Sequence, residues 1–516
     1  MKQAARVSLA LLVLVAVPAL ALDAPPGAPA QGGTLSLEEL VRDALRSSLS
    51  LRAAVTSTRS VETGVLAARG AFDPQLTASP AYSRGTTDVQ PLAPASTLSG
   101  VQTGKTGSVG IAGTLPTSTS YSASLDHSWQ NQSNAEIARL LATGAQPSVS
   151  TTLTLMLRQP LLKGLGPTIA TAPVRIAELL ARSAEERLNR SVEQTISDVE
   201  TAYWSLGSAE AGERLAKESV DRASDLVKRN EKMLELALIA DIDLITSRRG
   251  LQSRLTSLTE ARRRRQDALE RLVFLVYAER AVEKLPALSS LRTRPPVTSV
   301  PGIPEQDQLD ATALAQRGDV RAARLDVQQG ALSLEVAKNA LLPDLAVAGS
   351  YSPQTLAADK FRLWGNSRGL DQALSTWKVG LTFTYPLSSR TAKAAYQKSS
   401  WDSQGQAITL ALAENSVRAD VRSAARAVRT NAERLQQAEL GLDLARQQYE
   451  GGKRQLQLGL VDSFRLVQME DDLTNAELTA VSVRYDLAQA VTSYELATGS
   501  LRKKWARVEG EAARER

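Results

Sequence analysis

The chain has 516 residues, 43% of them hydrophobic, and carries a formal net charge of +6. This length is enough for several domains or for one long repeated domain, and so small a charge excess gives no indication of a nucleic-acid partner. Because the sequence contains no cysteine, it excludes disulfides, thiolate chemistry and a lipidated N-terminal cysteine.

The first 33 residues predict export rather than a folded domain. Residues 1–21 have the pattern of a secretory signal peptide, with Lys2 and Arg6 in the charged start, an apolar core and a small-residue cleavage site at Ala21. The apolar run is too short to span a bilayer as a helix. Residues 22–33 are rich in Pro, Ala and Gly, which is typical of a flexible leader.

We interpret residues 34–291 as the first of two repeats. A helix is predicted over 37–71, where apolar residues follow a helical period. The period changes to two over residues 75–158, which indicates strands with one apolar and one polar face. Four stretches alternate in this way: 76–82, 107–115, 119–129 and 149–157.

A long helical hairpin is predicted after the strands. The helical period resumes near Ile169, reverses at a tip near 237–243 and then returns. Residues 292–308 contain four prolines and one glycine, so we interpret them as a linker.

Residues 309–501 repeat the same order. A helix is followed by strands over 345–386 and by a second long hairpin with its tip near 459–464. At about 1.5 Å per residue, the longer arm of each hairpin would measure about 100 Å.

The returning helix of the second hairpin carries a heptad seam. Its members are Leu466, Met469, Leu473, Ala476, Ala480, Val483, Leu487, Ala490, Tyr494, Ala497 and Leu501. Residues 502–516 are expected to form a charged tail.

Amphipathic strands and very long helices together favour a membrane channel. A strand with an apolar face and a polar face suits a barrel with lipid outside and a wet lumen inside. We predict that one face of the last strand meets lipid, and that face consists of Trp377, Val379, Leu381 and Phe383. A soluble β-sandwich also alternates, but it does not explain the helical arms. One chain has too few strands to close a wide barrel, so several copies must share one.

At this point the sequence resembles the TolC family of outer-membrane efflux and secretion channels, over about residues 34–501. The resemblance rests on the order and duplication of short motifs. They are Gln-Pro-Leu-Leu at 159–162, Ala-Tyr-Trp at 202–204, Leu-Leu-Pro at 341–343, Gly-Leu-Val at 459–461, and Arg-Tyr-Asp-Leu-Ala at 484–488 with Gly-Ser-Leu at 499–501.

The resemblance implies an α+β membrane protein of two internal repeats that acts as a homotrimer. Three copies would share one transmembrane β-barrel in the outer membrane, continued by an α-helical coiled-coil barrel in the periplasm. A periplasmic adaptor (membrane fusion) protein would join the helix tips to an inner-membrane pump. The implied function is a passive duct of a tripartite efflux pump or a type I secretion system, for small molecules or polypeptides.

Three features depart from the family pattern. The family usually has two strands per repeat, whereas the first repeat here offers four. Residues 115–119 are either a short periplasmic turn, which makes 106–130 barrel strands, or part of an extracellular hairpin. Ala237 stands where the family often carries glycine. At the second tip, Arg465 stands where an acidic residue is usual, and Gln468 occupies a position that is acidic in some members. An acidic constriction would therefore need Asp462 or the stretch from Glu470 to Asp472 instead.

The two tips are the predicted sites of adaptor docking, because apolar residues there lie at helix reversals. The alternative is that they cap the hairpins internally. The predicted docking residues are Ala237, Leu238, Ile239 and Asp243 at the first tip, and Gly459, Leu460, Val461 and Phe464 at the second. A periplasmic gate is predicted at Asp462, Arg465 and Gln468. There Asp462 is one turn from Arg465 and close enough to pair with it, while Arg465 either lines the lumen or faces solvent outside the tunnel.

The sequence offers no catalytic or cofactor site. Its single histidine, His127, supplies neither a metal-ligand set nor a catalytic triad. We therefore expect no enzyme activity, no cofactor and no metal. The alternative function is a periplasmic structural coiled coil or an adaptor-like protein, although an adaptor would not show the duplicated order of helix, strands and helical hairpin.

Overall fold

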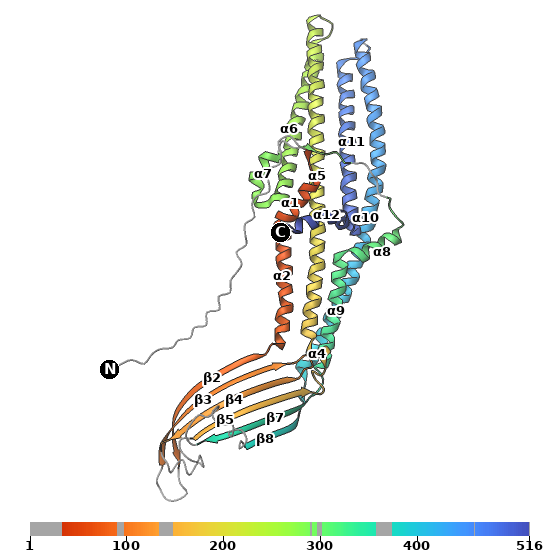
Figure 1. The fold of residues 1–516 in the computed structure, drawn as a ribbon. Coiled ribbons are helices and arrows are strands. Elements are labelled where there is room, and N and C mark those ends of the chain that lie inside the picture. The colour runs from red at the N-terminus through yellow and green to blue at the C-terminus, as the bar shows by residue number, and fades with distance from the viewer. Residues whose placement is uncertain are drawn as a thin grey trace, which may run out of the picture.

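The structure is a computed structural model that describes residues 34–89, 98–133, 148–288, 292–296, 302–357, 374–458 and 460–514. The expected signal peptide and leader lie outside these residues. Figure 1 shows a curved sheet at one end and a bundle of long helices that extends from it. Within the described part, no helix combines the length and the apolar character needed to cross a membrane.

Two consecutive helices lead to the sheet where a single helix over 37–71 was expected. They are α1 (Leu37–Ser47) and α2 (Leu49–Arg69). The chain is extended at Ser48, with ψ 122°, and this breaks the helical hydrogen bonding. Four strands follow: β2 (Gln75–Val89), β3 (Leu98–Thr114), β4 (Ser120–Gln132) and β5 (Ser148–Pro160).

The first long hairpin starts after the short helix α4 (Pro167–Ala170). Helix α5 (Ala172–Glu235) has 64 residues, so it is about 96 Å long at about 1.5 Å per residue. Helix α6 (Asp241–Tyr277) runs back beside it and is followed by α7 (Ala281–Leu288). The short strand β6 (Arg292–Thr293) then pairs in parallel with β1 (Thr34–Leu35).

After the predicted linker, the chain again forms two helices, strands and a long hairpin. The helices are α8 (Gln306–Gln316) and α9 (Gly318–Asn339), the strands β7 (Asp344–Ala357) and β8 (Leu374–Thr384), and the hairpin α10 (Arg390–Gln457) and α11 (Ser463–Thr498). Helix α10 has 68 residues and is about 102 Å long at the same rise per residue. The break between α8 and α9 falls at Arg317, which is extended like Ser48.

The chain contributes four helices at each level along the bundle. Toward the tips these are α5, α6, α10 and α11, with α11 packed against α5 (Figure 1). Toward the sheet they are α2, α5, α9 and α10. The short arms α6 and α11 end midway, where α1, α8 and α12 (Leu501–Arg514) gather around the bundle. The long arms therefore tie the two levels together.

The predicted heptad seam is the buried face of α11, except for its last member, Leu501, which begins α12 after the left-handed residue Gly499. Ten of its eleven members are buried, and Ala476 is half-buried. Such a seam buries one stripe of a helix against its neighbours, which is how long bundles gain most of their stability.

Residues 501–514 form the amphipathic helix α12 instead of the expected charged tail. Leu501, Trp505 and Val508 are buried in the core that also holds α1 and part of α5. Trp505 Nε1 donates to Glu200 Oε1 at 2.7 Å, and Glu200 is 1% exposed. The charged residues of this segment occupy the other face of the helix, which is why its composition alone suggested a tail.

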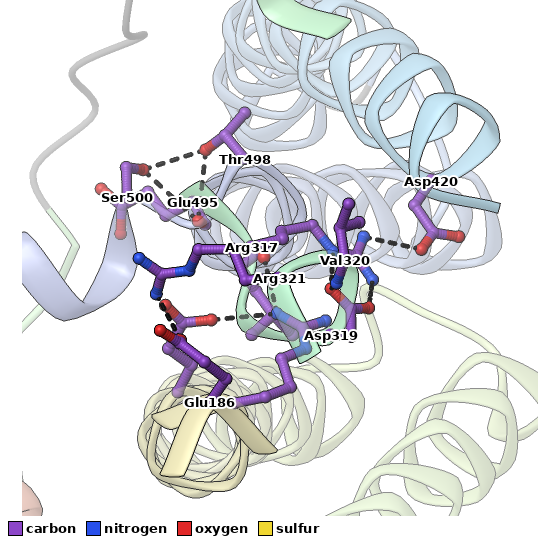
Figure 2. Close-up of polar contacts among 12 residues, drawn as sticks. Glu186, Arg317, Asp319, Val320, Arg321, Asp420, Glu495, Thr498 and Ser500 are labelled. Carbon is purple, nitrogen blue, oxygen red and sulfur yellow. Dashed lines mark hydrogen bonds and ion pairs between the residues drawn. The ribbon is translucent and has the colours of Figure 1, made fainter. Parts of the chain in front are cut away.

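A polar cluster holds the α8–α9 break against the hairpins (Figure 2). Arg317, 5% exposed in its side chain, donates to Asp420 on α10 at 2.9 Å and to Asp319 at 2.6 Å. Arg321 pairs with Glu186 on α5 at 2.7 Å. Burial would raise the pKa of Asp319, but hydrogen bonds and charge from Arg317 hold it below the usual value. The cluster therefore fixes α9 to both long arms.

Candidate functional site

Six of the eight strands in the described residues form one antiparallel sheet in the order β2-β3-β4-β5-β7-β8. Its register brings side chains of the same character to the same face. One row across the strands is Leu76, Ile111, Ala123, Leu155, Tyr351 and Trp377, and the next is Gln75, Ala112, Ser122, Met156, Ser350 and Lys378. The sheet therefore has one mainly apolar face and one mainly polar face.

The apolar face is exposed in the single chain. Trp377, Val379, Leu381 and Phe383 are 66–74% exposed, and Leu76 is 76% exposed. These side chains extend over strands from both halves of the sequence, since Leu157 pairs with Gly349, which pairs with Val379. An apolar surface of this extent marks contact with lipid or with another protein.

Proline causes one local irregularity in the sheet. The β5–β7 pairing runs from Val149 to Thr152 and resumes at Leu155, so it is interrupted opposite Pro353. Proline has no backbone N–H to donate to a ladder. The polar and apolar faces keep their register on both sides of this gap.

The first tip is a helix C-terminal motif with alanine in the left-handed position. Ala237 has a φ of 55°. The N–H of Ala237 donates to the carbonyl of Leu234, and the N–H of Leu238 donates to that of Met233. This pair of hydrogen bonds defines the Schellman motif, in which glycine is the usual left-handed residue. The structure thus gives a physical reason for the glycine that the family often carries here.

We expect Ala237→Gly to stabilise the protein by about 1 kcal/mol, because glycine adopts positive φ without the steric cost that alanine pays. The shift of the unfolding midpoint in denaturant measures this effect. Ala240→Gly is the matched control, since Ala240 has an ordinary φ of −83°. An Ala237→Gly variant no more stable than the control would contradict this reading of the tip.

The predicted docking residues at the first tip lie in or beside the loop between α5 and α6. Leu238 is 63% exposed, whereas Ile239 is half-buried. Asp243 lies in the first turn of α6, where its N–H donates to the carbonyl of Ala240 at 3.0 Å. The structure adds exposed apolar residues that the sequence analysis did not single out: Leu236, Ile242 and Ile245.

The second tip shares one hydrogen bond of this motif. The N–H of Leu460 donates to the carbonyl of Gln455 at 2.9 Å, which matches the bond from Leu238 at the first tip. Gly459 lies outside the described residues. Leu460 is 70% exposed and Phe464 49%, whereas Val461 is half-buried. Both tips therefore present apolar side chains to solvent.

The predicted gate residues are arranged differently from the expected Arg–Asp pair. Asp462 is the N-cap of α11, and its carboxylate accepts from the backbone N–H of Arg465 at 2.8 Å. The guanidinium of Arg465 instead donates to Gln468 at 3.3 Å. Within one chain, Asp462 thus stabilises the start of the helix, while the Arg465 side chain remains exposed.

A charged cluster that the sequence analysis missed joins the two hairpins close to their tips. We call it the hairpin joint, and it consists of Arg222 on α5, Arg254 on α6, and Glu470, Asp471 and Glu477 on α11. Glu470 Oε1 lies 3.5 Å from Arg222 Nε and 3.6 Å from Arg254 Nε. Arg254 also donates to Asp471 at 2.8 Å.

The centre of the hairpin joint is buried but weakly bonded. Glu470 is 2% exposed, and the side chain of Arg254 is 8% exposed. Glu470 Oε1 and the Nε atoms of both arginines have no hydrogen-bond partner. Burial raises the pKa of Glu470, although the charges of Arg254 and Arg222 act to lower it. Desolvation therefore outweighs the ion pairs, which is common when buried charges lack good hydrogen bonds.

Glu470→Gln, which resembles the protonated carboxyl, should be at least as stable as the original at pH 7. The folded-state pKa of Glu470 lies above its unfolded value of 4.5. The protonated carboxyl of Glu470 therefore contributes most to the stability of the fold below pH 4.5, and this contribution is lost as the pH rises through the folded-state pKa. We expect the variant to be more stable than the original at pH 7, and this advantage to vanish near pH 4, where the carboxyl of Glu470 is protonated in both states. Melting curves across this range test it, and an advantage independent of pH would contradict it.

A neutral contact reinforces the hairpin joint closer to the second tip. Asn230 on α5 donates to Ser463 Oγ at 3.1 Å, and both residues are buried. Little in the sequence indicates the contacts of the hairpin joint or the contact between Asn230 and Ser463. Glu470 is an acidic residue next to the apolar seam member Met469, but its partners lie more than 200 positions away.

Comparison with known proteins agrees with this architecture. The family model described as outer membrane efflux protein matches residues 310–500. The solved structure of the outer-membrane channel OprN is 17% identical, with a TM-score of 0.66 and 90% of each chain covered. The Campylobacter jejuni outer membrane channel CmeC is 15% identical, with a TM-score of 0.64, over 92% of this chain and 89% of that one.

A third solved structure has the same fold. The Vibrio cholerae outer membrane protein VceC is 16% identical, with a TM-score of 0.63, over 90% of this chain and 96% of that one. No curated protein sequence matches the chain. The family model and the fold shared over most of the chain agree with the resemblance seen in the sequence: residues 310–500 match the outer membrane efflux protein family, and the chain has the fold of solved outer-membrane channels.

Proposed function

We propose that the chain forms the outer-membrane channel-tunnel of an efflux pump or a type I secretion system, a passive duct across the periplasm and outer membrane. The observation that carries this proposal is the two-faced sheet, exposed on its apolar side and fused to helices about 100 Å long. Lipid covers such a face in an outer-membrane barrel, while the polar face lines water. The exposed apolar face argues against a soluble periplasmic coiled-coil protein or adaptor.

Assembly as a homotrimer is supported by surfaces that a single chain leaves uncovered. Strands β2 and β8 are the two edges of the sheet, and neighbouring copies would pair them edge to edge. Helix α10 presents an exposed apolar stripe in which Trp401 is 70% exposed, Ile408 63% and Leu412 64%. We propose that a neighbouring copy covers this stripe. The two repeats would then give the helical tube a pseudo-sixfold arrangement.

We further propose that a periplasmic adaptor docks on the two tips and links the duct to an inner-membrane pump. Both tips expose leucine at the residue that closes the helix, Leu238 and Leu460. Their equivalent backbone geometry would allow one adaptor surface to recognise both. The sheet would lie in the outer membrane, and the tips would lie farthest from it in the periplasm.

Leu460→Asp is expected to abolish export while trimers still assemble in the outer membrane, because the change places a charge on an apolar contact and touches no core residue. Gln457→Asp is the control, since it adds the same charge to an exposed polar site nearby. Drug susceptibility or secretion by cells, together with trimer levels on unheated gels, measures the effect. Retained export, or loss of the trimer, would remove the docking assignment.

We propose that the hairpin joint keeps the periplasmic end narrow until the adaptor binds. It attaches the second hairpin to both helices of the first, at a level where small displacements change the width of the opening. Its central ion pairs are long, at 3.5 and 3.6 Å, and Glu470 Oε1 accepts no hydrogen bond, so they offset little of the cost of burying Glu470. Arg465 lies closer to the second tip than the hairpin joint does. In the trimer, the positive charges of three copies of Arg465 would repel one another at the periplasmic opening.

A further inference from the structure

The hairpin formed by β3 and β4 is part of the sheet throughout its length. β3 pairs with β2 from Gln75↔Ala112 to Val89↔Leu98, and β4 pairs with β5 from Ser120↔Arg158 to Gln130↔Ser148. Both outer sides of the hairpin are therefore bonded to strands that lead to helices of the bundle, since β2 follows α2 and β5 precedes α4 and α5. A hairpin standing above the membrane would have free edges instead.

The turn of this hairpin lies at the helical end of the sheet. The N–H of Leu115 donates to the carbonyl of Thr119 at 2.8 Å, and Ser118 adopts a φ of 71°. Gln159 Nε2 donates to the carbonyl of Thr117, and Ser118 Oγ donates to that of Gly166, which precedes α4. The turn therefore sits where the sheet meets the helices, and the two strands run the height of the wall.

The hairpin also has the two faces that a barrel wall requires. Ile111 lies in the apolar row of Leu76 and Leu155, and Val109 and Leu125 lie on the same face, in the row of Ala78 and Leu153. The opposite face carries Ser108, Ser124, Asp126 and Ser128, of which Ser128 bonds to Ser150 of β5 at 2.8 Å. The strands of this hairpin thus separate lipid from water in the same sense as the rest of the sheet.

We propose that the trimer closes an eighteen-stranded barrel as wide as its helical tube, so that the outer-membrane segment does not narrow the duct for large hydrated cargo. The inference rests on the proposed channel function. Three copies of the six-stranded sheet give eighteen strands. If neighbouring strands are about 4.8 Å apart and tilted by about 40° from the barrel axis, the circumference of the barrel is about 113 Å. The diameter of the barrel, measured between backbones, is then about 36 Å.

The helical tube has nearly the same calculated size. Three copies of four helices at each level give twelve helices, and axes about 10 Å apart give a circumference of about 120 Å. Without the hairpin, twelve strands would enclose only about 24 Å between backbones. Allowing about 5 Å of side chain on each wall, the lumen is about 26 Å wide with the hairpin and about 14 Å without it. Polar cargo about 20 Å across, such as a partly folded polypeptide or a polysaccharide, would pass only the wider barrel.

The register offers a clean deletion that tests this proposal. Across the hairpin, Gln75 is aligned with Ala112, Ser122 and Met156 in succession. If residues 98–132 are removed, β2 can pair with β5 in the register Gln75↔Met156 without exchanging its faces. The variant should therefore still form a trimeric channel, with a barrel reduced to twelve strands.

The experiment measures single-channel conductance in planar bilayers while polyethylene glycols of graded size are added on the side of the barrel. In the original protein, polymers about 20 Å across should enter and lower the conductance. The deletion variant should exclude polymers of this size, because the cross-sectional area of its barrel lumen is about threefold smaller. If the original excludes them too, the wide barrel is refuted while the channel function stands. Absence of any channel would refute the proposed function itself.

A second measurement does not depend on the deletion variant folding. Because the chain has no cysteine, Thr117→Cys gives a single label site at the turn. A polyethylene-glycol maleimide too bulky for the duct should label it only after the outer membrane is permeabilised, as it should label the control Lys228→Cys on α5, where the side chain is 67% exposed. Labelling of Thr117→Cys on intact cells would place the turn outside and overturn the proposal.

Discussion

Replacing Arg254 with alanine is expected to open the periplasmic end of the channel and raise its single-channel conductance. The change leaves Glu470 buried beside one arginine instead of two and removes the partner of Asp471. Removing one member of a buried ion pair costs about 3–5 kcal/mol when the remaining charge keeps no partner, so a smaller loss is expected here, because Arg222 still lies 3.5 Å from Glu470. The second hairpin should then separate from α6, and cells should become sensitive to large antibiotics.

Arg264→Ala is the matched control for this prediction. Arg264 lies on the same helix and pairs with Glu260 at 3.3 Å, but its side chain is 70% exposed. A surface pair of this kind contributes about 0–1 kcal/mol, so its loss should leave conductance unchanged. An Arg254→Ala channel with the conductance of this control would show that the hairpin joint does not restrict the opening.

Val379→Arg is expected to cost about 2–4 kcal/mol of stability in the membrane and to reduce the amount of trimer in the outer membrane. Val379 is the middle residue of the 11 in β8 and lies on the apolar face, 70% exposed in the single chain. Near the middle of the bilayer, an arginine there would meet hydrocarbon. Heat-modifiable migration of outer-membrane extracts measures the amount of trimer.

Thr382→Arg provides the control on the opposite face of the same strand. Thr382 follows Leu381 and shares its face with Lys378, a basic residue that the sheet already carries. In the proposed barrel it points into water, so the added charge should be tolerated. Equal trimer levels for the two variants would contradict the assignment of the lipid-facing side.

The parts of the fold that follow from local periodicity could be predicted from the sequence. The spacing of Leu466, Met469 and Leu473 is a helical seam wherever the helix packs, and these residues are buried. The alternation around Val109 and Leu125 likewise requires strands, and both residues lie in the sheet. In such stretches the residue pattern and the tertiary environment select the same local structure.

Features that depend on contacts between distant segments could not be predicted from local periodicity. The helix break at Arg317 has no proline, but at the adjacent Gly318 an added Cβ would lie 2.5 Å from the carbonyl oxygen of Glu186 on α5. The hairpin joint is likewise invisible along the sequence, because the partners of Glu470 come from two other helices. The helix at 501–514 was hidden by its charged face, since only Leu501, Trp505 and Val508 reveal its apolar stripe.

Electron cryo-microscopy of the protein purified from outer membranes tests most directly whether three copies of this chain build one continuous duct. We expect a trimer in which β2 of each copy pairs with β8 of the next, closing one barrel above a single helical tube. Particles in which the sheets stay open, or pack face to face in a soluble assembly with their apolar sides covered, would contradict it.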